Sequence, residues 1–373
     1  MAVISIREID RADIKQFITF PFKIYRTCKY WVPPLIPDDM KTFSSENPAF
    51  EYCRVKFFMA YRDGEPAGRI AGIINEKYIE KWNNNYMRFG WIDFIEDRDV
   101  AFKLLEAVEQ WAREENMEAV NGPLGFTDLD PEGMLVEGFD EMGTLPMIYN
   151  YSYYPQYLEE YGYRKDVDWY EFEVKVPESI PPKIERVRDI VLEKTGVRLP
   201  ETKKRKELLD YVPGIFEVIN ESYNNLYGVV ELNEKQVDFY TEQYFSFIDP
   251  DFVPILLDES NKVAGFGIAM PSLSRALQRA GGKIFPFGFI HLLLAMKFPS
   301  QIDLYLVGVR NRYKNKGLNA VLMSYMIETC IKRGIKSAET SGELETNKKV
   351  QSFWKHFERR HHKTRRCYIK HLE

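Results

Sequence analysis

The segment from Leu304 to Leu322 joins an apolar run to a helical pattern through a strongly basic loop. The cations of this loop are Arg310, Arg312, Lys314 and Lys316. Backbone N–H groups at the start of a helix have no intrahelical partner and carry partial positive charge, so such a turn can hold an anion, above all a pyrophosphate. Gly317 would let the backbone approach the phosphates without an intervening Cβ. The alternative interpretation is a solvated basic loop before a surface helix.

This segment resembles motif A of the GNAT superfamily of acyl-CoA N-acyltransferases, whose pattern Q/R-x-x-G-x-G/A follows a central strand. Lys314 stands at the Q/R position, Gly317 at the first glycine, and Asn319 replaces the second glycine or alanine. Further on, Asn347 resembles the asparagine that opens the family's next motif. Trp354 stands where the family commonly has a tyrosine that acts as general acid.

The resemblance implies an acetyl-CoA or other acyl-CoA co-substrate and no metal. A pantetheine arm would pair with the backbone of Val307 and Val309 between two splayed central strands. The other expected contacts to coenzyme A are Lys314, Asn315, Lys316, Gly317, Leu318, Asn319, Ala320 and Asn347. The resemblance also implies direct attack of a neutral amine on the thioester, with a backbone N–H stabilising the oxyanion.

The attacking amine needs a base, or a water path to one. The candidates on or beside the central strands are Asp303, Glu339, Glu343 and Glu345. We place Glu345 first because it lies two residues before Asn347, near where the thioester would be, and then Glu343 and Glu339. The alternative interpretation of each is a solvated loop carboxylate.

Two segments bear on the acceptor. Residues 273–298 form an insertion that is basic at first and then rich in Phe and Leu. It is interpreted as a buried helix pair or lid, or alternatively as an apolar channel or interfacial patch with peripheral membrane contact through 284–298. The long loop 121–154 is expected to cover a site between two halves of the chain. The expected substrate contacts are Tyr153, Tyr154, Phe287 and Tyr305.

These residues are positioned by elements that occur twice. The order helix, hairpin, strand, helix, strand, helix, strand is predicted in both halves, with hairpins at 55–74 and 253–270. We therefore predict an α/β (α+β) fold of two tandem GNAT-like domains, each a mixed, mostly antiparallel sheet flanked by helices. The predicted units are 1–176, a linker helix within 177–199, and 200–373, which contains motif A.

The first half differs at the corner that would hold the pyrophosphate. Its strand-to-helix turn, Ile95 to Asp99, has three acidic residues and no glycine. Carboxylates at a helix start repel a pyrophosphate and compete for the same N–H groups. We therefore expect the 1–176 unit to lack the pyrophosphate loop and to bind no coenzyme A.

Composition excludes several classes of function. Lys plus Arg number 51 and Asp plus Glu number 56, so the net charge of −5 gives no case for binding nucleic acid. The four cysteines are scattered without CxxC pairs, which fits neither a disulfide framework nor a zinc site and indicates a cytoplasmic location. Asp128 to Gly133 opens like a calcium loop, but Phe139 occupies its twelfth position. The basic run from Lys355 to Lys370 is predicted to be a surface strand.

The sequence therefore predicts an acyl-CoA-dependent N-acyltransferase that transfers an acetyl or longer acyl group to a small-molecule amine. One alternative is a long-chain N-acyltransferase acting on a lipid-like amine. The alternative from another class is a catalytically silent protein that binds acyl-CoA or serves as a scaffold. The acceptor, the acyl length and the oligomeric state stay open.

Overall fold

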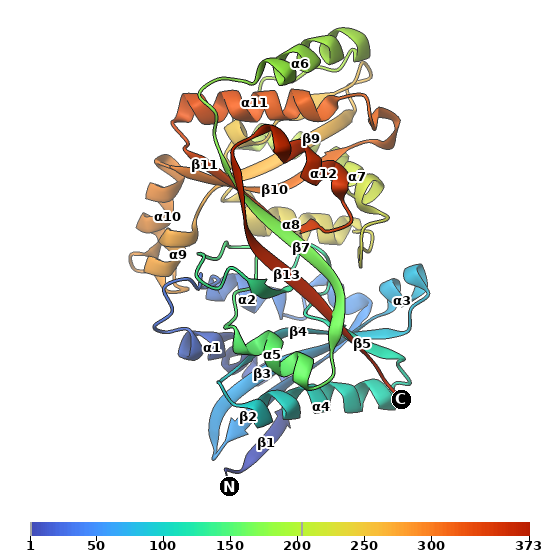
Figure 1. The fold of residues 1–373 in the computed structure, drawn as a ribbon, viewed down its shortest axis with the longest axis vertical. Helices are drawn as coiled ribbons and strands as arrows, with labels where there is room; N and C mark the ends of the chain where they lie inside the picture. Colours follow the sequence, from blue (N-terminus) through green and yellow to red (C-terminus); the bar gives the residue numbers. More distant parts are fainter. Residues whose placement is uncertain (1, 203) are drawn as a thin grey trace.

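The computed structural model describes residues 2–202 and 204–373, whose strands form one continuous mixed sheet (Figure 1). The strands are β1 (Ile4–Glu8), β2 (Cys53–Arg62), β3 (Glu65–Asn75), β4 (Tyr86–Phe94), β5 (Ala119–Gly122), β6 (Met134–Glu137), β7 (Arg164–Lys175), β8 (Ile255–Leu257), β9 (Val263–Pro271), β10 (Gln301–Val309), β11 (Ser337–Thr340), β12 (Glu343–Leu344) and β13 (Arg359–His371). Their order is β1-β2-β3-β4-β5-β13-β7-β11-β10-β9-β8, and β6 and β12 pair with β13 and β7 respectively.

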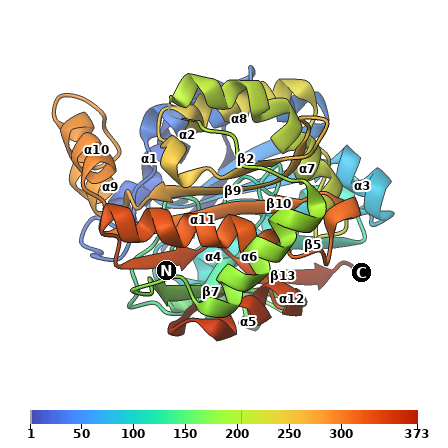
Figure 2. The ribbon, with the colours of Figure 1, turned by 90° about the horizontal axis from the view of Figure 1, so that it is seen from above.

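Helices cover both faces of this sheet. They are α1 (Ile14–Ile24), α2 (Ile36–Thr42), α3 (Glu76–Trp82), α4 (Arg98–Glu114), α5 (Tyr153–Glu160), α6 (Pro182–Thr195), α7 (Val212–Tyr223), α8 (Glu234–Phe245), α9 (Ser274–Ala280), α10 (Gly288–Lys297), α11 (Leu318–Arg333) and α12 (Lys348–Phe353). In the second half, α11 lies on one face of β9 and β10, whereas α8 lies on the other (Figure 2). The repeated order of elements and the mixed, mostly antiparallel sheet confirm the predicted fold class.

The two halves exchange strands at their junction. β7, the last strand of the first half, lies between β13 and β11, and β13, the last strand of the chain, lies between β5 and β7. The antiparallel β7–β13 ladder runs from Arg359 opposite Val174 to Ile369 opposite Arg164. Each half of the sheet is thus completed by a strand from the other half, so sites near the junction are built from both.

The packing of α4 against β3 shows how a helix is held close to the sheet. The buried stripe of α4 contains Leu104 and Trp111, and it packs against β3. The strand presents Gly68 and Gly72 to this helix, where an added Cβ would lie 2.6 Å from Leu104 Cδ1 and 3.0 Å from Trp111 Cε3. The absence of side chains at these two positions lets the helix approach the sheet closely.

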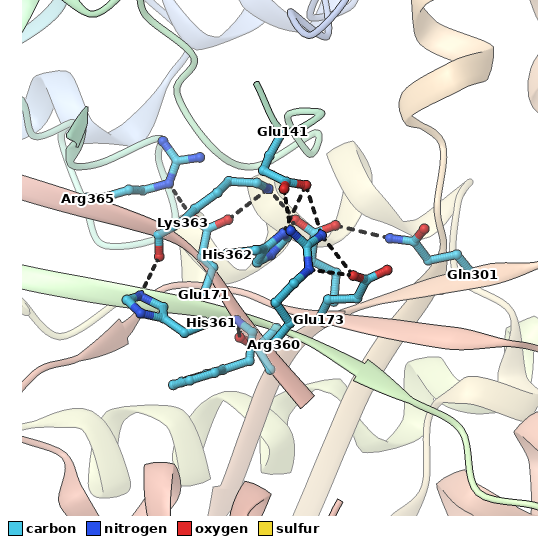
Figure 3. A network of polar contacts seen from close by, with 12 residues as sticks. Glu141, Glu171, Glu173, Gln301, Arg360, His361, His362, Lys363 and Arg365 are labelled. Atoms are coloured by element: carbon cyan, nitrogen blue, oxygen red, sulfur yellow. Dashed lines mark hydrogen bonds and ion pairs between the residues drawn. The ribbon is translucent and has the colours of Figure 1, made fainter. Parts of the chain in front are cut away.

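A buried cluster of charges holds the β7–β13 ladder together (Figure 3). Lys363 lies opposite Glu171 in the register, and its Nζ is 3.1 Å from Glu171 Oε2. Lys363 also pairs with Glu339 of β11, and Arg365 pairs with Glu171. The side chains of Glu171, Lys363 and Arg365 are 1% exposed or less. The expectation that the basic run 355–370 is a surface strand is therefore wrong for its centre, because acidic residues of β7 and β11 neutralise it inside the protein.

Burial alone would raise the pKa of Glu171, but the charges of Arg365 and Lys363 outweigh burial and lower this pKa to about 2. Glu171 is therefore ionised throughout the neutral range. Two cations share its charge, and Glu339 supplies the second anion of the cluster. A buried cluster of this kind requires all its members, because removal of one leaves an uncompensated charge away from water.

Replacement of Glu171 by Ala is expected to lower the free energy of unfolding by about 3–5 kcal/mol, since Lys363 and Arg365 lose their shared anion. Urea denaturation of the two proteins measures this difference. The matched control is Glu173→Ala on the same strand, because Glu173 is 40% exposed and its ion pair with Arg360 lies at the surface. Its expected loss is below about 1 kcal/mol.

The effect of Glu171 also depends on pH. Its folded-state pKa lies below the ordinary value of 4.5, so its contribution is complete above that value and is lost as the pH falls toward 2. The stability difference between the natural protein and Glu171→Gln is therefore expected to shrink over this interval. Equal losses for Glu171→Ala and Glu173→Ala, or a difference that does not change with pH, would contradict the assignment.

Candidate functional site

The central strands of the second half separate at their carboxyl ends. β10 and β11 pair in parallel only from Gln301 opposite Ser337 to Leu304 opposite Thr340. β10 continues to Val309, still paired with β9 on its other side, but no strand of the described chain pairs with its β11-facing edge there. At this edge the hydroxyl of Tyr223 donates to the Val307 carbonyl at 3.1 Å and accepts from the Val307 amide at 3.2 Å. An extended ligand could pair with this edge if Tyr223 moved aside.

The start of α11 offers unused backbone donors beside that edge. Gly317 precedes the helix with φ +84°, a conformation that favours glycine, and no side chain caps the helix. Within the described residues, the amides of Asn315, Gly317, Leu318 and Asn319 donate no hydrogen bond. Four free N–H groups at a helix N-terminus form a concave donor surface for an anion.

The cations of the loop before α11 divide into two groups. Arg310 pairs with Glu217 and Glu221, and Arg312 pairs with Asp258. Lys314 makes no ion pair with any residue that the structure describes, and Lys316 lies over the ring of Tyr313 at 5.3 Å. The lysines therefore retain positive charge for an anionic ligand, whereas the arginines are neutralised by neighbouring acids.

The corresponding corner of the first half is filled by its own side chains. The carboxylate of Asp97 accepts from the amides of Asp99 and Val100 at 3.0 and 3.3 Å, at the start of α4. The edge of β4 is also occupied, because the Tyr154 hydroxyl accepts from the Phe94 amide and the Tyr153 hydroxyl donates to the Phe94 carbonyl, both at 2.9 Å. The two halves thus differ at the helix start, where amides that are free in the second half have a carboxylate partner in the first, whereas tyrosine hydroxyls bond to the strand edge in both halves.

A cavity of about 470 Å³ lies where β10 and β11 separate, and both halves contribute to it. On the side of α11 and α12 its walls include Asn319, Leu322, Met323, Asn347, Lys349, Phe353 and Trp354. On the side of α7 and α8 they include Ile215, Phe216, Leu226, Tyr240, Tyr244 and Ile268. The loop between β5 and α5 adds Asp128, Asp130, Glu132 and Met147. The cavity thus passes the open edge of β10 and has a mostly apolar chamber beyond it.

Glu343 is the carboxyl group best placed for chemistry in this cavity. It lies on β12 in the cavity wall, where its Oε1 accepts a hydrogen bond from Trp354 Nε1. Its Oε2 is buried without a hydrogen-bond partner in the described part of the chain. Burial raises the pKa of Glu343 to about 7. A carboxyl group that exchanges its proton near neutral pH is suited to general acid–base chemistry.

A second carboxyl group comes from the first half. Asp128 also lines the cavity, burial raises its pKa to about 6, and its Oδ1 has no hydrogen-bond partner among the described residues. Tyr223, whose hydroxyl bonds to Val307, lines the same cavity, and burial together with the charge of Asp128 raises the pKa of Tyr223 to about 12. Sequence analysis assigned no catalytic role to Asp128 or Tyr223. The sequence features that draw attention to Asp128 are the calcium-loop-like stretch that begins with it and the length of the 121–154 loop.

The other three carboxyl groups proposed as bases do not line this cavity. Glu345 lies outside the cavity wall, where it pairs with Lys165 at 2.7 Å and accepts from the Asp168 amide at 3.2 Å. Glu339 belongs to the buried ion cluster. Asp303 on β10 lies opposite Glu339 in the strand register. Burial together with the charge of Glu339 raises the pKa of Asp303 to about 8.

The remaining predicted contacts fall into three groups. Tyr305, Val307, Asn319 and Asn347 line the cavity. Lys314, Asn315, Lys316, Gly317 and Leu318 form the loop and helix start, Val309 ends β10, and the amide of Ala320 bonds to the Gly317 carbonyl at 2.9 Å. Tyr153, Tyr154 and Phe287 do not line the cavity. The two tyrosines are bonded to β4, and Phe287 is 67% exposed on the α9–α10 insertion.

Known proteins resemble this chain in sequence and in fold. No model of a known protein family matches the chain. The protein YghO of Escherichia coli (strain K12) is 26% identical over 348 residues, covering 91% of this chain and 88% of that protein. The bacterial ceramide synthase of Caulobacter vibrioides (strain NA1000 / CB15N) is 25% identical over 372 residues, covering 97% and 95%.

A solved tandem GNAT protein from the clavulanic acid biosynthesis pathway superposes with a TM-score of 0.55 at 11% identity, covering 99% of this chain and 98% of its own. At this identity the likeness concerns the fold. It agrees with the duplicated order of elements, the parallel β10–β11 pair that separates at its carboxyl end, and the glycine at the start of α11. The chain therefore has the GNAT fold, in a tandem form that spans almost its whole length.

Proposed function

We propose that this protein is an acyl-CoA-dependent N-acyltransferase whose second half holds the acyl-CoA and whose first half completes the acceptor chamber. The observation that carries the proposal is the arrangement around the open edge of β10. Free amides and unpaired lysines lie at the start of α11, a carboxyl group with a pKa of about 7 lies in the cavity wall, and an apolar chamber extends beyond them.

The residues at this corner fit coenzyme A. The amides of Asn315 and residues 317–319, with Lys314 beside them, would hold the pyrophosphate. The backbone edge of residues 305–309 would pair with the pantetheine arm. Acyl-CoA would supply an acyl group activated as a thioester.

We assign Glu343 as the general base. Its carboxylate accepts a proton from the amine as the C–N bond forms and the C–S bond breaks, and it then delivers that proton to the departing thiolate. This cycle needs no tyrosine at position 354. Trp354 instead donates a hydrogen bond to Glu343 and fixes the orientation of its carboxyl group.

The lining of the chamber favours a long acyl chain or a lipid-like amine over acetyl transfer to a small amine. Aliphatic and aromatic side chains dominate the walls formed by α7, α8 and β9. Asp128, Asp130 and Glu132 give one wall an acidic character that suits an amine. The similarity to a bacterial ceramide synthase supports the same class of acceptor.

A second candidate function is a protein that binds acyl-CoA without turning it over. One observation favours it: the hydroxyl of Tyr223 occupies both hydrogen-bonding groups of Val307, where the pantetheine arm would pair. In the catalytic proposal Tyr223 must give way when the thioester binds. The kinetic experiments below separate the two functions, because a silent protein would bind coenzyme A and show no turnover with any amine.

Replacement of Lys314 by Glu is expected to weaken binding of coenzyme A by at least about tenfold, because a charge-assisted contact is lost and a like charge is added. Isothermal titration calorimetry measures the affinity. The matched control is Lys332→Glu near the opposite end of α11, where Lys332 is exposed and pairs with Glu328. Equal effects of the two variants would argue against the cradle.

Replacement of Glu343 by Gln is expected to lower kcat by about 10²–10⁴-fold, since the general base is lost. In the natural protein the rate should rise with pH through the pKa of Glu343, about 7, because the carboxylate form is the active one. Steady-state rates over a pH series check both points, and the variant should lose this limb of the profile. A larger loss in Glu345→Gln than in Glu343→Gln would transfer the role to Glu345.

The natural protein is expected to prefer long-chain acyl-CoA or long-chain amines. Ile268 lines the chamber on β9, and Ile268→Trp would fill part of it. This variant should shift the preference toward shorter chains by about tenfold or more in kcat/KM, because each excluded methylene forfeits roughly 0.8 kcal/mol of burial. Rates with thioesters and amines of increasing length measure the shift. Fastest turnover of acetyl-CoA with small amines in the natural protein would contradict this assignment.

A further inference from the structure

The α9–α10 insertion forms a helical hairpin at the edge of the molecule (Figure 2). Its inner side is anchored to the first half. Leu273 and Leu277 pack with Val32 and Leu35, and the Gly282 carbonyl accepts from the Ile36 amide at 3.0 Å. The hairpin is therefore held in a fixed position, and its outer side faces away from the body of the protein.

The outer side of this hairpin is apolar. Its exposed large hydrophobic side chains are Phe285, Phe287, Phe289, Ile290, Leu293, Leu294 and Phe298. Phe285, Phe287 and Phe298 are 76%, 67% and 69% exposed. Ile290, Leu293 and Leu294 follow helical spacing on one face of α10, and the rings of Phe285 and Phe289 lie 5.9 Å apart. Isolated exposed hydrophobic residues are common on soluble proteins, but a contiguous group of this size marks an interaction surface.

The exposed charges of the hairpin are all positive. The exposed cations of the hairpin are Arg275, Arg279, Lys283 and Lys297. None of them makes an ion pair with a residue that the structure describes. No Asp or Glu occurs between Glu259 and Asp303, although the whole chain has a net charge of −5. The charge of this surface is thus opposite to that of the protein as a whole.

We propose that the outer side of α10 and the preceding loop, residues 283–298, docks on the surface of a lipid membrane that contains anionic lipids. Phe and Leu side chains would enter the interfacial region, and the exposed cations Lys283 and Lys297 would contact the lipid phosphates. No helix of the described chain is both long and apolar enough to cross a bilayer.

The same charges argue against a second copy of this chain as the occupant. A twofold contact through this surface would bring Lys283 and Lys297 of one copy close to the same cations of the other, without an acidic residue on the hairpin to compensate. An anionic lipid surface satisfies both the apolar and the basic parts. This inference goes beyond the proposed acyl transfer and does not require it.

Vesicle co-sedimentation of the full chain tests the proposal, with no thioester or amine present. The protein is expected to sediment with vesicles of phosphatidylcholine mixed with phosphatidylglycerol at least about tenfold more than with phosphatidylcholine alone, and added salt should weaken this binding. The triple variant Phe285→Ser, Leu293→Ser, Phe298→Ser should reduce binding to the mixed vesicles by about tenfold or more. The double variant Lys283→Gln, Lys297→Gln should remove most of the preference for anionic lipid.

The matched control is Ile331→Ser, which removes an apolar residue that is 38% exposed on α11, away from the hairpin. It should bind vesicles like the natural protein. Circular dichroism and thermal unfolding show whether each variant is folded. Failure of the natural protein to bind mixed vesicles, equal loss of binding in Ile331→Ser, or a lipid-free dimer that the triple variant dissociates would overturn the proposal. None of these results depends on whether the protein transfers acyl groups.

Discussion

The β7–β13 ladder is the contact on which the rest of the structure depends. Each strand completes the sheet of the half to which it does not belong in sequence, so neither half is closed without the other. Burying Glu171, Lys363, Arg365 and Glu339 at this junction is unfavourable for each charge alone. Together they neutralise one another across three strands, which fixes both the register of the ladder and the position of the first half beside the cavity of the second.

The corner between a central strand and the following helix differs between the two halves. In the first half, Asp97 supplies an internal anion to the amides at the start of α4, and Tyr153 and Tyr154 bond to the edge of β4. In the second half, the amides before and at the start of α11 stay free. The start of α4 therefore offers fewer free donors than the start of α11, while the 121–154 loop of the first half contributes Asp128 to the cavity.

Local sequence predicted the elements well because their signals are local. The hairpins, the basic loop and the glycine at the start of α11 could be read from residue types and spacing. The strand exchange could not, since nothing in residues 359–371 indicates that their neighbours are residues 119–122 and 164–175. Contacts between residues far apart in the sequence also distinguish the candidate bases Glu343 and Glu345. Glu343 and Glu345 are equivalent in the local sequence, but Lys165 of the first half pairs with Glu345 and leaves Glu343 in the cavity wall.

Glu171 and Glu343, the proposed general base, show how neighbours decide the protonation of two carboxyl groups within one sheet. Both are withdrawn from water, and burial acts on both by raising the pKa. Around Glu171, two cations reverse this effect and lower the pKa to about 2, so the group stays ionised and serves stability. Around Glu343 the main hydrogen-bond donor is the neutral indole of Trp354, which only partly offsets burial and leaves the pKa at about 7. A buried carboxylate becomes useful for proton transfer when its neighbours stabilise neither protonation state strongly. By this criterion the tryptophan at position 354 belongs to the proposed site, because it donates a hydrogen bond to Glu343 without adding a positive charge.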